Sequence, residues 1–429
     1  MSSSTSKQSA SLELQKKIFT LVKQTKKASV EAAQIPSNLK NKVLAEVAKQ
    51  LEKQKDFLIR ENQKDLQFAK SLGLSSAMMD RLTLNPQRIT TMAEGVKTVI
   101  DLKDPIGVVQ SSWKRPNGIK ISKITVPLGV ILIIYEARPN VTVDCAALCL
   151  KSSNAVILRG GKEAFYSNQA LVKIFQEALK KYRLSPEIVE FVRTTEYEAV
   201  DLLLGCEKEI NLVIPRGGEA LIRKVVQHSR IPVVKHYQGI CHVYVDQSAD
   251  LKKAEAIILN AKLQRPGVCN AMETLLVHQS VAGKLLPALG KKLHDKACEV
   301  RASSEAKKWM PHAKLAQSND FGREFLDKIL AVKTVKSLEE AIEHIQQYGS
   351  GHTDAIVSSN KKSTETFKRL IDSASVMVNA STRFSDGFEF GFGAEIGIST
   401  DKIHARGPMG LEGLTSYKYV VEGNGQIRS

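Results

Sequence analysis

Hydrophobic and polar positions divide the chain into a helical first part and a longer part in which strands and helices alternate. Apolar residues recur at helical spacing over residues 12–104, and charged residues occupy the opposite positions. Pro36 interrupts this pattern, and Asn85 precedes a further helix that runs from Pro86 to Leu102. The first hundred residues are therefore predicted to form helices that pack by their apolar faces.

Residues 107–125 alternate between apolar and polar positions around Asn117 and Gly118. Asn-Gly between two alternating runs is typical of a β-hairpin. A hairpin between two domain-sized segments often serves association, and packing on its own domain is the alternative.

From residue 126 onwards, short apolar strands alternate with helices. The run Val126–Tyr135 predicts one buried strand, and the alternation continues as far as Val376–Val378. This order predicts parallel sheets covered by helices on both faces. Two such units are predicted to meet near residue 250, with Val243–Val245 as the last strand of the first unit, and residues 301–322 are predicted to be irregular.

Length and charge narrow the class of protein. A chain of 429 residues is too long for one typical core and suggests two domains. The net charge of +17 suits a nucleic-acid binder, a membrane-surface binder or an enzyme for anionic ligands. Because basic residues are spread along the whole chain and no RNA-binding signature appears, anionic metabolites and cofactors are favoured and no nucleic-acid partner is predicted.

The cysteines and apolar segments indicate a cytoplasmic protein. None of the six cysteines forms a Cys-x-x-Cys pair or has a histidine at zinc-finger spacing, so no metal site is predicted and a reducing compartment is favoured. The N-terminus lacks the apolar core of a signal peptide, and the longest apolar run is too short to cross a membrane. No membrane partner is expected.

Two Arg-Gly-Gly turns each follow a strand and precede a helix. They are Arg159-Gly160-Gly161 and Arg216-Gly217-Gly218. Ligands of open parallel sheets bind beyond the carboxyl ends of the strands, where a glycine pair lets the backbone approach a phosphate. The turns therefore predict a nucleotide site, and tight turns without a ligand are the alternative. Residues 391–397 are one residue too long for a dinucleotide fingerprint and are interpreted as a loop.

Cys269 lies on a predicted loop, because Pro266 and Gly267 precede it and a strand begins near Thr274. A loop thiol near a positive charge such as Arg265 can have a lowered pKa and be reactive. On these residues alone, a structural cysteine is an equal alternative.

Several long motifs cover nearly the whole chain from about residue 15. They are Pro127–Val130, Ile134–Asp144, Asn154–Gly161, Gln264–Asn270, Glu273–Val277, Val378–Phe384 and His404–Thr415. These motifs closely resemble the glutamate-5-semialdehyde dehydrogenase family, also called gamma-glutamyl phosphate reductases, of the aldehyde dehydrogenase superfamily. The resemblance implies an aldehyde dehydrogenase-like α/β fold with two doubly wound parallel-sheet domains and an oligomerisation hairpin.

The resemblance also implies a division of the chain into five segments. They are a helical part of the cofactor domain at 1–106, the hairpin at 107–125, an NADP-binding domain at 126–249, a catalytic domain at 250–377 and a return to the cofactor domain with an oligomerisation segment at 378–429.

The implied activity is the NADPH-dependent reduction of L-glutamyl 5-phosphate to L-glutamate 5-semialdehyde with release of phosphate, the second step of proline biosynthesis. Cys269 would then form a thioester, and Asn140 with the backbone amide of Cys269 would stabilise the oxyanion. Arg159 matches the position that contacts the adenosine ribose region, where an arginine could favour a 2′-phosphate, and Glu324 resembles a contact to the nicotinamide ribose. The expected partners are the acyl phosphate and phosphate, a separate glutamate kinase, and further copies of the chain in a homo-oligomer.

Basic and polar residues in the matching motifs are the candidates for binding the phosphate and amino-acid end of the substrate. They are Arg138, Arg265, Asn379, Ser381, Thr382, Arg383 and Arg406. A structural salt bridge is the alternative for each arginine. Two positions depart from the family pattern, because Phe388 stands where Gly is usual and Gly267 where Ser is usual, and both could alter the shape of a loop near the site.

Particular residues disfavour two other functions. Hydrolytic aldehyde dehydrogenases carry a glutamate base in a motif that corresponds to His236–His242, and no glutamate is present there. A hydrolytic semialdehyde dehydrogenase is therefore disfavoured, because its thioester would need an activated water. A basic RNA-binding or scaffold protein is disfavoured by Cys269, Asn140 and the two Arg-Gly-Gly turns.

Overall fold

The computed structural model describes residues 2–428, which form two compact units. Unit 1 contains the described residues up to Lys235 together with residues 391–397 and 409–428, and unit 2 contains His236–Phe390 and Ile398–Pro408. Strand β7 (Cys241–Val245) belongs to unit 2, because it pairs in parallel with β8 (Met272–His278) and β12 (Thr353–Val357). The expected place of Val243–Val245 in the first unit was therefore wrong.

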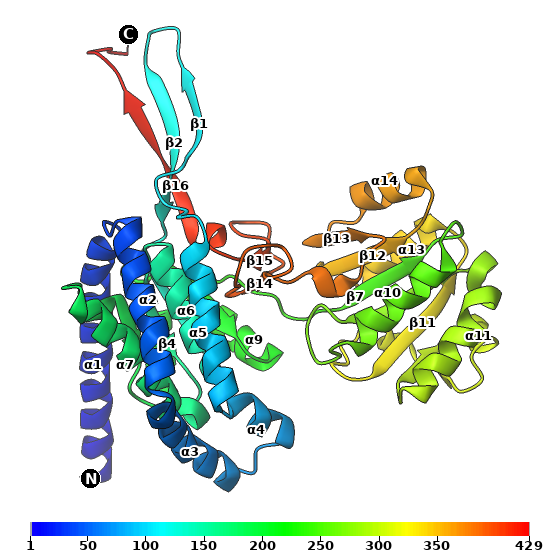
Figure 1. Cartoon of the computed structure of the whole chain (residues 1–429), viewed down its shortest axis with the longest axis horizontal. Coiled ribbons are helices and arrows are strands. Elements are labelled where there is room, and N and C mark those ends of the chain that lie inside the picture. Colours follow the sequence, from blue (N-terminus) through cyan, green and yellow to red (C-terminus); the bar gives the residue numbers. More distant parts are fainter. Residues whose placement is uncertain (1, 429) are drawn as a thin grey trace. The chain divides into compact units, whose positions relative to one another are not determined.

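Unit 1 begins with five helices, as the apolar spacing predicted (Figure 1). They are α1 (Ser2–Ala32), α2 (Ser37–Lys53), α3 (Lys55–Ser71), α4 (Ser76–Leu82) and α5 (Pro86–Asp101). Asn85 caps α5, because its side chain accepts a hydrogen bond of 2.8 Å from the backbone N–H of Arg88. Among the described residues, no helix is long and apolar enough to cross a membrane.

The sheet of unit 1 has four parallel strands in the order β5-β4-β3-β6. The strands are β3 (Val130–Tyr135), β4 (Ala155–Arg159), β5 (Val189–Phe191) and β6 (Leu212–Arg216), and the helices that follow them are α6 (Pro139–Lys151), α7 (Phe165–Lys181), α8 (Glu198–Leu204) and α9 (Glu219–His228). Every residue of β3 and β4 is buried, as expected for a sheet covered on both faces.

The predicted hairpin is confirmed, with one change at its end. Strands β1 (Val109–Lys114) and β2 (Lys120–Pro127) are antiparallel, and Gly118 closes the turn by donating to the carbonyl of Arg115 at 2.9 Å. The apolar run Val126–Tyr135 was expected to be one strand, but β2 ends at Pro127 and β3 begins at Val130. Gly129 lies between them with φ +121°, a conformation that breaks a continuous strand.

The sequence pattern did not predict that a third strand, β16 (Thr415–Glu422), would pair with β2. The three strands extend away from the helices of unit 1 (Figure 1). They expose the aromatic side chains of Trp113, Tyr417 and Tyr419. The role of this sheet in association stays a prediction.

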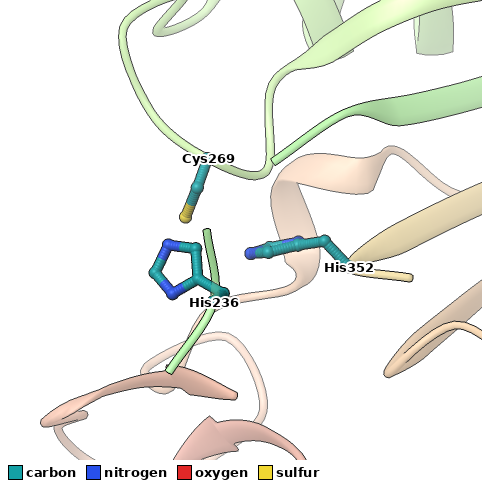
Figure 2. Close-up of side chains that lie close together, drawn as sticks. All are labelled: His236, Cys269 and His352. Carbon is teal, nitrogen blue, oxygen red and sulfur yellow. The ribbon is translucent and has the colours of Figure 1, made fainter. Parts of the chain in front are cut away.

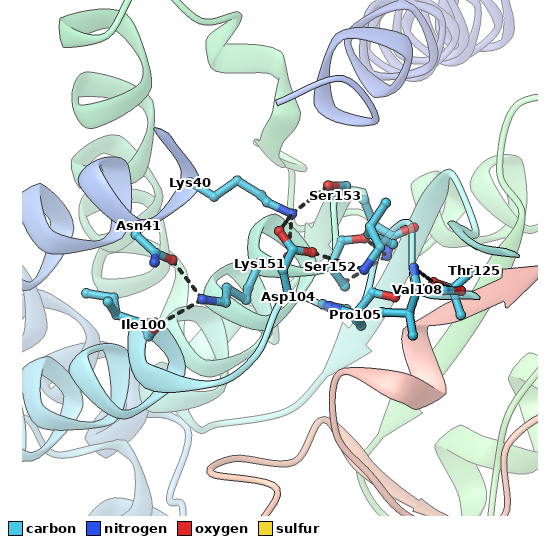
Figure 3. Close-up of polar contacts among 12 residues, drawn as sticks. Lys40, Asn41, Ile100, Asp104, Pro105, Val108, Thr125, Lys151, Ser152 and Ser153 are labelled. Atoms are coloured by element: carbon cyan, nitrogen blue, oxygen red, sulfur yellow. Dashed lines mark hydrogen bonds and ion pairs between the residues drawn. The ribbon is translucent and has the colours of Figure 1, made fainter. Parts of the chain in front are cut away.

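Two buried lysines join the helices of unit 1 to the base of the hairpin (Figure 3). Lys40 Nζ lies 2.5 Å from a carboxylate oxygen of Asp104 and donates to Ser153 Oγ at 3.0 Å. Lys151 Nζ donates to Asn41 Oδ1 and to the carbonyl of Ile100, both at 2.7 Å. Burial lowers the pKa of Lys40, and the neighbouring Asp104 carboxylate counteracts that effect. The network ties α2, α5 and α6 together through groups that would be costly to leave unpaired.

Unit 2 is a seven-stranded sheet in the order β10-β9-β11-β8-β7-β12-β13, with helices on both faces. Its other strands are β9 (Glu299–Ala302), β10 (Lys314–Leu315), β11 (Ile329–Val335) and β13 (Ser375–Val378), and its long helices are α10 (Leu251–Leu263), α11 (Gln279–Asp295), α13 (Leu338–Tyr348) and α14 (Lys361–Leu370). Alternation along β7 produces the two layers, because Val243 and Val245 pack with α10 and α11 whereas Tyr244 packs with α13 and α14. This confirms the predicted α/β class.

One segment of unit 2 is more regular than expected. Residues 301–322 were predicted to be irregular, but they contain the end of β9, the short helix α12 (Ser304–Lys307), strand β10 and a turn of 3₁₀ helix at Ser318–Asp320. These elements are too short for apolar periodicity to reveal them.

Candidate active site

Cys269 lies in the loop between α10 and β8, as the sequence predicted, and its side chain is partly exposed whereas the other five cysteines are buried. The loop is held from both sides. Cys241 Sγ donates to the carbonyl of Cys269 at 3.2 Å, and the side chain of Asn270 donates to the carbonyl of Ser385 at 2.8 Å. The guanidinium of Arg383 donates to the side-chain oxygen of Asn270. An accessible thiol therefore sits on an anchored backbone.

The segment before β7 lies directly against this loop. A Cβ atom at Gly239 would lie 2.0 Å from the carbonyl oxygen of Cys269 and 2.6 Å from its Cα, so only glycine fits there. The backbone N–H of Gly239 donates to Glu324 Oε1 at 2.9 Å. Glu324, the predicted cofactor contact, is thus bonded to the backbone beside the predicted nucleophile.

His236 faces the sulfur of Cys269 (Figure 2). Its Nδ1 lies 2.9 Å from the carbonyl oxygen of Ile398 in β14 (Gly397–Ser399). Because a carbonyl only accepts, Nδ1 carries a proton, so in the neutral ring the lone pair is on Nε2. Such a nitrogen can accept the proton of a thiol and so favour the reactive thiolate.

His352 is buried and points toward the same space (Figure 2). Its Nδ1 lies 2.8 Å from Thr353 Oγ1, and its Nε2 has no hydrogen-bond partner. Burial lowers the pKa of His352 from its usual 6.5 to about 3, and the charge of neighbouring His236 adds to this lowering. The ring is therefore neutral at physiological pH.

Strand order explains how these three residues meet. His236 precedes β7, Cys269 precedes β8 and His352 precedes β12, and these three parallel strands are neighbours in the sheet of unit 2. Their amino ends lie at one edge. Neither histidine was predicted to have a role, because no local spacing links them to Cys269.

Arg383, one of the predicted substrate arginines, interacts electrostatically with Cys269 and with Arg265. Burial lowers the pKa of the Arg383 guanidinium, and the positive charge of Arg265 adds to this lowering. The negative charges of Asp386 and of the Cys269 thiolate act in the opposite direction. A guanidinium remains charged in any protein environment, so this group supplies positive potential at the thiol. That potential favours the thiolate and an anionic substrate.

Asn379, Ser381 and Thr382 follow β13 and lead to Arg383. The side chain of Asn379 bonds the backbone N–H and carbonyl of Ser358, both at 2.9 Å, and Ser381 Oγ accepts from the backbone N–H of Arg383 at 3.2 Å. Thr382 is buried, and its hydroxyl has no hydrogen-bond partner. In this arrangement Asn379 and Ser381 shape the segment. Their binding of substrate stays a prediction.

Arg406, another predicted substrate residue, forms an ion pair in unit 2. Its Nη1 lies 2.7 Å from Asp372 Oδ1, and its Nη2 donates to the backbone carbonyl of the same residue at 2.5 Å. Arg406 therefore forms the structural salt bridge that was the alternative to substrate binding, and its binding of substrate stays a prediction.

Arg138 and Asn140 lie at the start of α6 in unit 1, and both are exposed. The side-chain nitrogen of Asn140 donates to Asp144 Oδ2 at 3.3 Å. Burial raises the pKa of Asp144 to about 6, whereas Asn140 and Arg216 lower it. Asn140 therefore has a partner that orients its carboxamide, and its role at the oxyanion stays a prediction.

The two Arg-Gly-Gly turns lie on either side of β3. Arg159 ends β4 and pairs with Ile134, and Arg216 ends β6 and pairs with Tyr135, so both turns leave the carboxyl edge of one sheet. Arg159 is buried, its Nη1 donates to the carbonyl of Gly160 at 2.9 Å, and its Nε has no partner.

The backbone N–H of Gly218 donates to Glu136 Oε2 at 3.0 Å at the start of α9. A carboxylate thus already bonds an amide of the kind that binds phosphate. These basic groups, amides and the unsatisfied Nε of Arg159 suit an anionic nucleotide.

Comparison with known proteins identifies the family of this chain. The model of the aldehyde dehydrogenase family matches residues 5–322, and the chain therefore belongs to this family of oxidoreductases, which implies a nicotinamide cofactor.

Within that family its relatives are gamma-glutamyl phosphate reductases. The protein of that name from Carboxydothermus hydrogenoformans is 53% identical over 96% of this chain and 99% of its own length, and that from Thermodesulfovibrio yellowstonii is 50% identical over 97% and 100%. The crystal structure of the Thermotoga maritima gamma-glutamyl phosphate reductase matches with a TM-score of 0.94 at 43% identity over 96% of this chain and all of that one.

Proposed function

We propose that this chain reduces L-glutamyl 5-phosphate to L-glutamate 5-semialdehyde with NADPH, releases phosphate, and acts in the second step of proline biosynthesis. The names of its relatives, which share about half of its residues over nearly the full length, support the substrate. The observation that carries the mechanism is the partly exposed Cys269 thiol on its anchored loop, facing the imidazole of His236.

His236 begins the reaction by accepting the thiol proton of Cys269 at Nε2, which is possible because Nδ1 already donates to Ile398. The thiolate attacks the acyl carbon, a C–S bond forms and the C–O bond to phosphate breaks. The proton held on His236 neutralises the departing phosphate. The result is a thioester on Cys269, and the positive charge of Arg383 and Arg265 stabilises the anionic groups during the exchange.

The nicotinamide cofactor, when bound, supplies the hydride that reduces the acyl group. Arg159, Arg216 and the glycines that follow them would hold its phosphates at the carboxyl edge of the sheet of unit 1. Asn140 and the amide of Cys269 would donate to the oxyanion that forms at both stages. Collapse of the thiohemiacetal then releases the aldehyde and returns the Cys269 thiolate.

The segment from His236 to His242 supports reduction over hydrolysis. It contains no glutamate, and Gly239 is pressed against the backbone of Cys269, so no larger side chain fits at that position. The carboxylate of Glu324 is bonded to the Gly239 amide. A thioester in these surroundings is directed to hydride or phosphate.

The reverse reaction tests the proposal. NADP⁺ should be reduced by glutamate semialdehyde only when phosphate is present, because an oxidiser that hydrolyses its thioester needs no phosphate. Cys269→Ala should lower kcat by more than about 10⁴-fold, and Cys298→Ala, which removes a buried thiol elsewhere in unit 2, should leave it within about twofold. Activity that is independent of phosphate, or that persists without Cys269, would contradict the mechanism. A higher kcat/KM with NAD⁺ than with NADP⁺ would contradict the cofactor assignment.

A further inference from the structure

We propose that His236, Cys269 and His352 form a binding site for Zn²⁺, and that the bound ion reversibly blocks the Cys269 thiol. One side-chain atom from each of the three residues lies within 4.8 Å of the other two. The sequence predicted no metal site, because the three residues are far apart along the chain and share no ligand motif. This inference concerns binding and does not depend on the reaction proposed above.

The donor set selects the ion. One thiolate and two imidazoles suit Zn²⁺, whereas Mg²⁺ and Ca²⁺ prefer oxygen ligands. Zn–S and Zn–N bonds of about 2.3 and 2.0 Å require ligand atoms closer together than the 4.8 Å within which these atoms lie, so the side chains would close by up to roughly 1 Å around the ion. Cys269 and His236 are only partly buried and can move in this way.

Both histidines are oriented as metal ligands usually are. A ligating imidazole commonly donates its second N–H to a carbonyl or other acceptor, which fixes the ring and directs the lone pair at the metal. His236 Nδ1 lies 2.9 Å from the carbonyl oxygen of Ile398, and His352 Nδ1 lies 2.8 Å from Thr353 Oγ1. The Thr353 hydroxyl can accept a proton from Nδ1 of His352, and in that tautomer the lone pair of His352 is on Nε2.

The unsatisfied nitrogen of His352 is separate evidence that a ligand binds here. It is completely buried, yet its Nε2 has no hydrogen-bond partner, and Figure 2 shows the ring directed toward Cys269 and His236. A buried polar nitrogen left unsatisfied costs about 1–3 kcal/mol. A metal bond to this nitrogen would remove that cost.

Three protein ligands leave one position of a tetrahedral Zn²⁺ open. A sulfur bound to the ion is a weaker nucleophile than the free thiolate toward a carbonyl carbon or an alkylating reagent. Bound Zn²⁺ would therefore inhibit the enzyme and shield its reactive cysteine, and a chelator would restore both activity and reactivity.

Direct titration of the full-length, chelator-treated protein tests the site. Zn²⁺ followed by calorimetry should bind at one ion per chain, and Co²⁺ should give a thiolate-to-metal charge-transfer band. Outer-shell changes alone weaken metal sites about 10–100-fold, so loss of a ligand in Cys269→Ser, His236→Asn or His352→Asn should weaken binding by more than about 100-fold.

His312→Asn is the matched control, because it removes one ring of the stacked His294–His312 pair, a histidine pair elsewhere in unit 2. It should bind Zn²⁺ like the wild type. Undiminished binding to Cys269→Ser, or absence of the charge-transfer band in the wild type, would overturn the proposal.

A second measurement needs no variant, which matters because His352 is buried and its replacement can disturb folding. Iodoacetamide should label Cys269 first, since the other cysteines are buried, and mass spectrometry can identify the labelled residue. Stoichiometric Zn²⁺ should slow that labelling at least tenfold, and a chelator should restore it. An unchanged labelling rate at saturating Zn²⁺ would refute a site that includes the thiol.

Discussion

Gly239→Ala should disable the candidate active site without replacing any side chain that takes part in the chemistry. The methyl group would lie 2.0 Å from the carbonyl oxygen of Cys269 and 2.6 Å from both its carbonyl carbon and its Cα. All three are backbone atoms, so no side chain can rotate away to make room.

The size of the effect follows from these distances. Real Cβ atoms essentially never approach another heavy atom closer than 3.0 Å, so the Gly239 and Cys269 backbones must separate by at least about 1 Å. Such overpacking costs about 1–3 kcal/mol of stability. A misplacement of about 1 Å can cost 10²-fold in rate, because the thiol no longer meets the acyl carbon in line. The hydrogen bond from the Gly239 amide to Glu324 would be displaced as well.

We would measure kcat/KM in the phosphate-dependent reverse reaction, together with the free energy of unfolding. The expected result is a loss of about 10²-fold in kcat/KM in a protein that still folds. Gly95→Ala is the matched control, because it adds the same methyl inside α5, where the nearest atom is a carboxylate oxygen of Asp144 at an ordinary 3.8 Å. Wild-type kcat/KM and wild-type stability in Gly239→Ala would refute the reasoning.

Three further predictions concern stability. Gly95→Ala should raise the free energy of unfolding by about 0.5–1 kcal/mol in urea, because the helix interior has room for the methyl and the unfolded chain loses freedom. Lys40→Met should lower it by about 3 kcal/mol, because the Asp104 carboxylate loses its buried partner, and an equally stable variant would show that the pair contributes nothing. Burial lowers the pKa of His344 from 6.5 to about 3. As the pH falls below 6.5, this histidine is therefore protonated in the unfolded chain but not in the folded one. The free energy of unfolding should then fall by about 1.4 kcal/mol at pH 5.5. His344→Leu should therefore reduce the difference in unfolding free energy between pH 7.5 and 5.5 by that amount, and an unchanged difference would contradict a buried neutral ring.

Local patterns were enough to predict most of the elements. The helices of the first hundred residues, the hairpin at Asn117-Gly118 and the strand–helix alternation that follows were correct because each depends on contacts between near neighbours in sequence. Where pairing partners are distant, the pattern failed. It could not assign β7 to the second sheet or join β16 to the hairpin, since strand neighbours are chosen by the whole fold.

The same division holds for the candidate site. Local sequence was enough to place Cys269 on a loop before a strand, to place two Arg-Gly-Gly turns after strands, and to show the resemblance to one family of reductases. Which side chains surround the thiol depends on how the strands assemble in space. His236 and His352 lie beside the thiol because β7, β8 and β12 are neighbours in the sheet, although other elements separate them along the chain. Glycine is required at position 239 because the backbone there touches the backbone of Cys269, 30 residues away in sequence. Periodicity records which face of an element is buried, but not which element it meets.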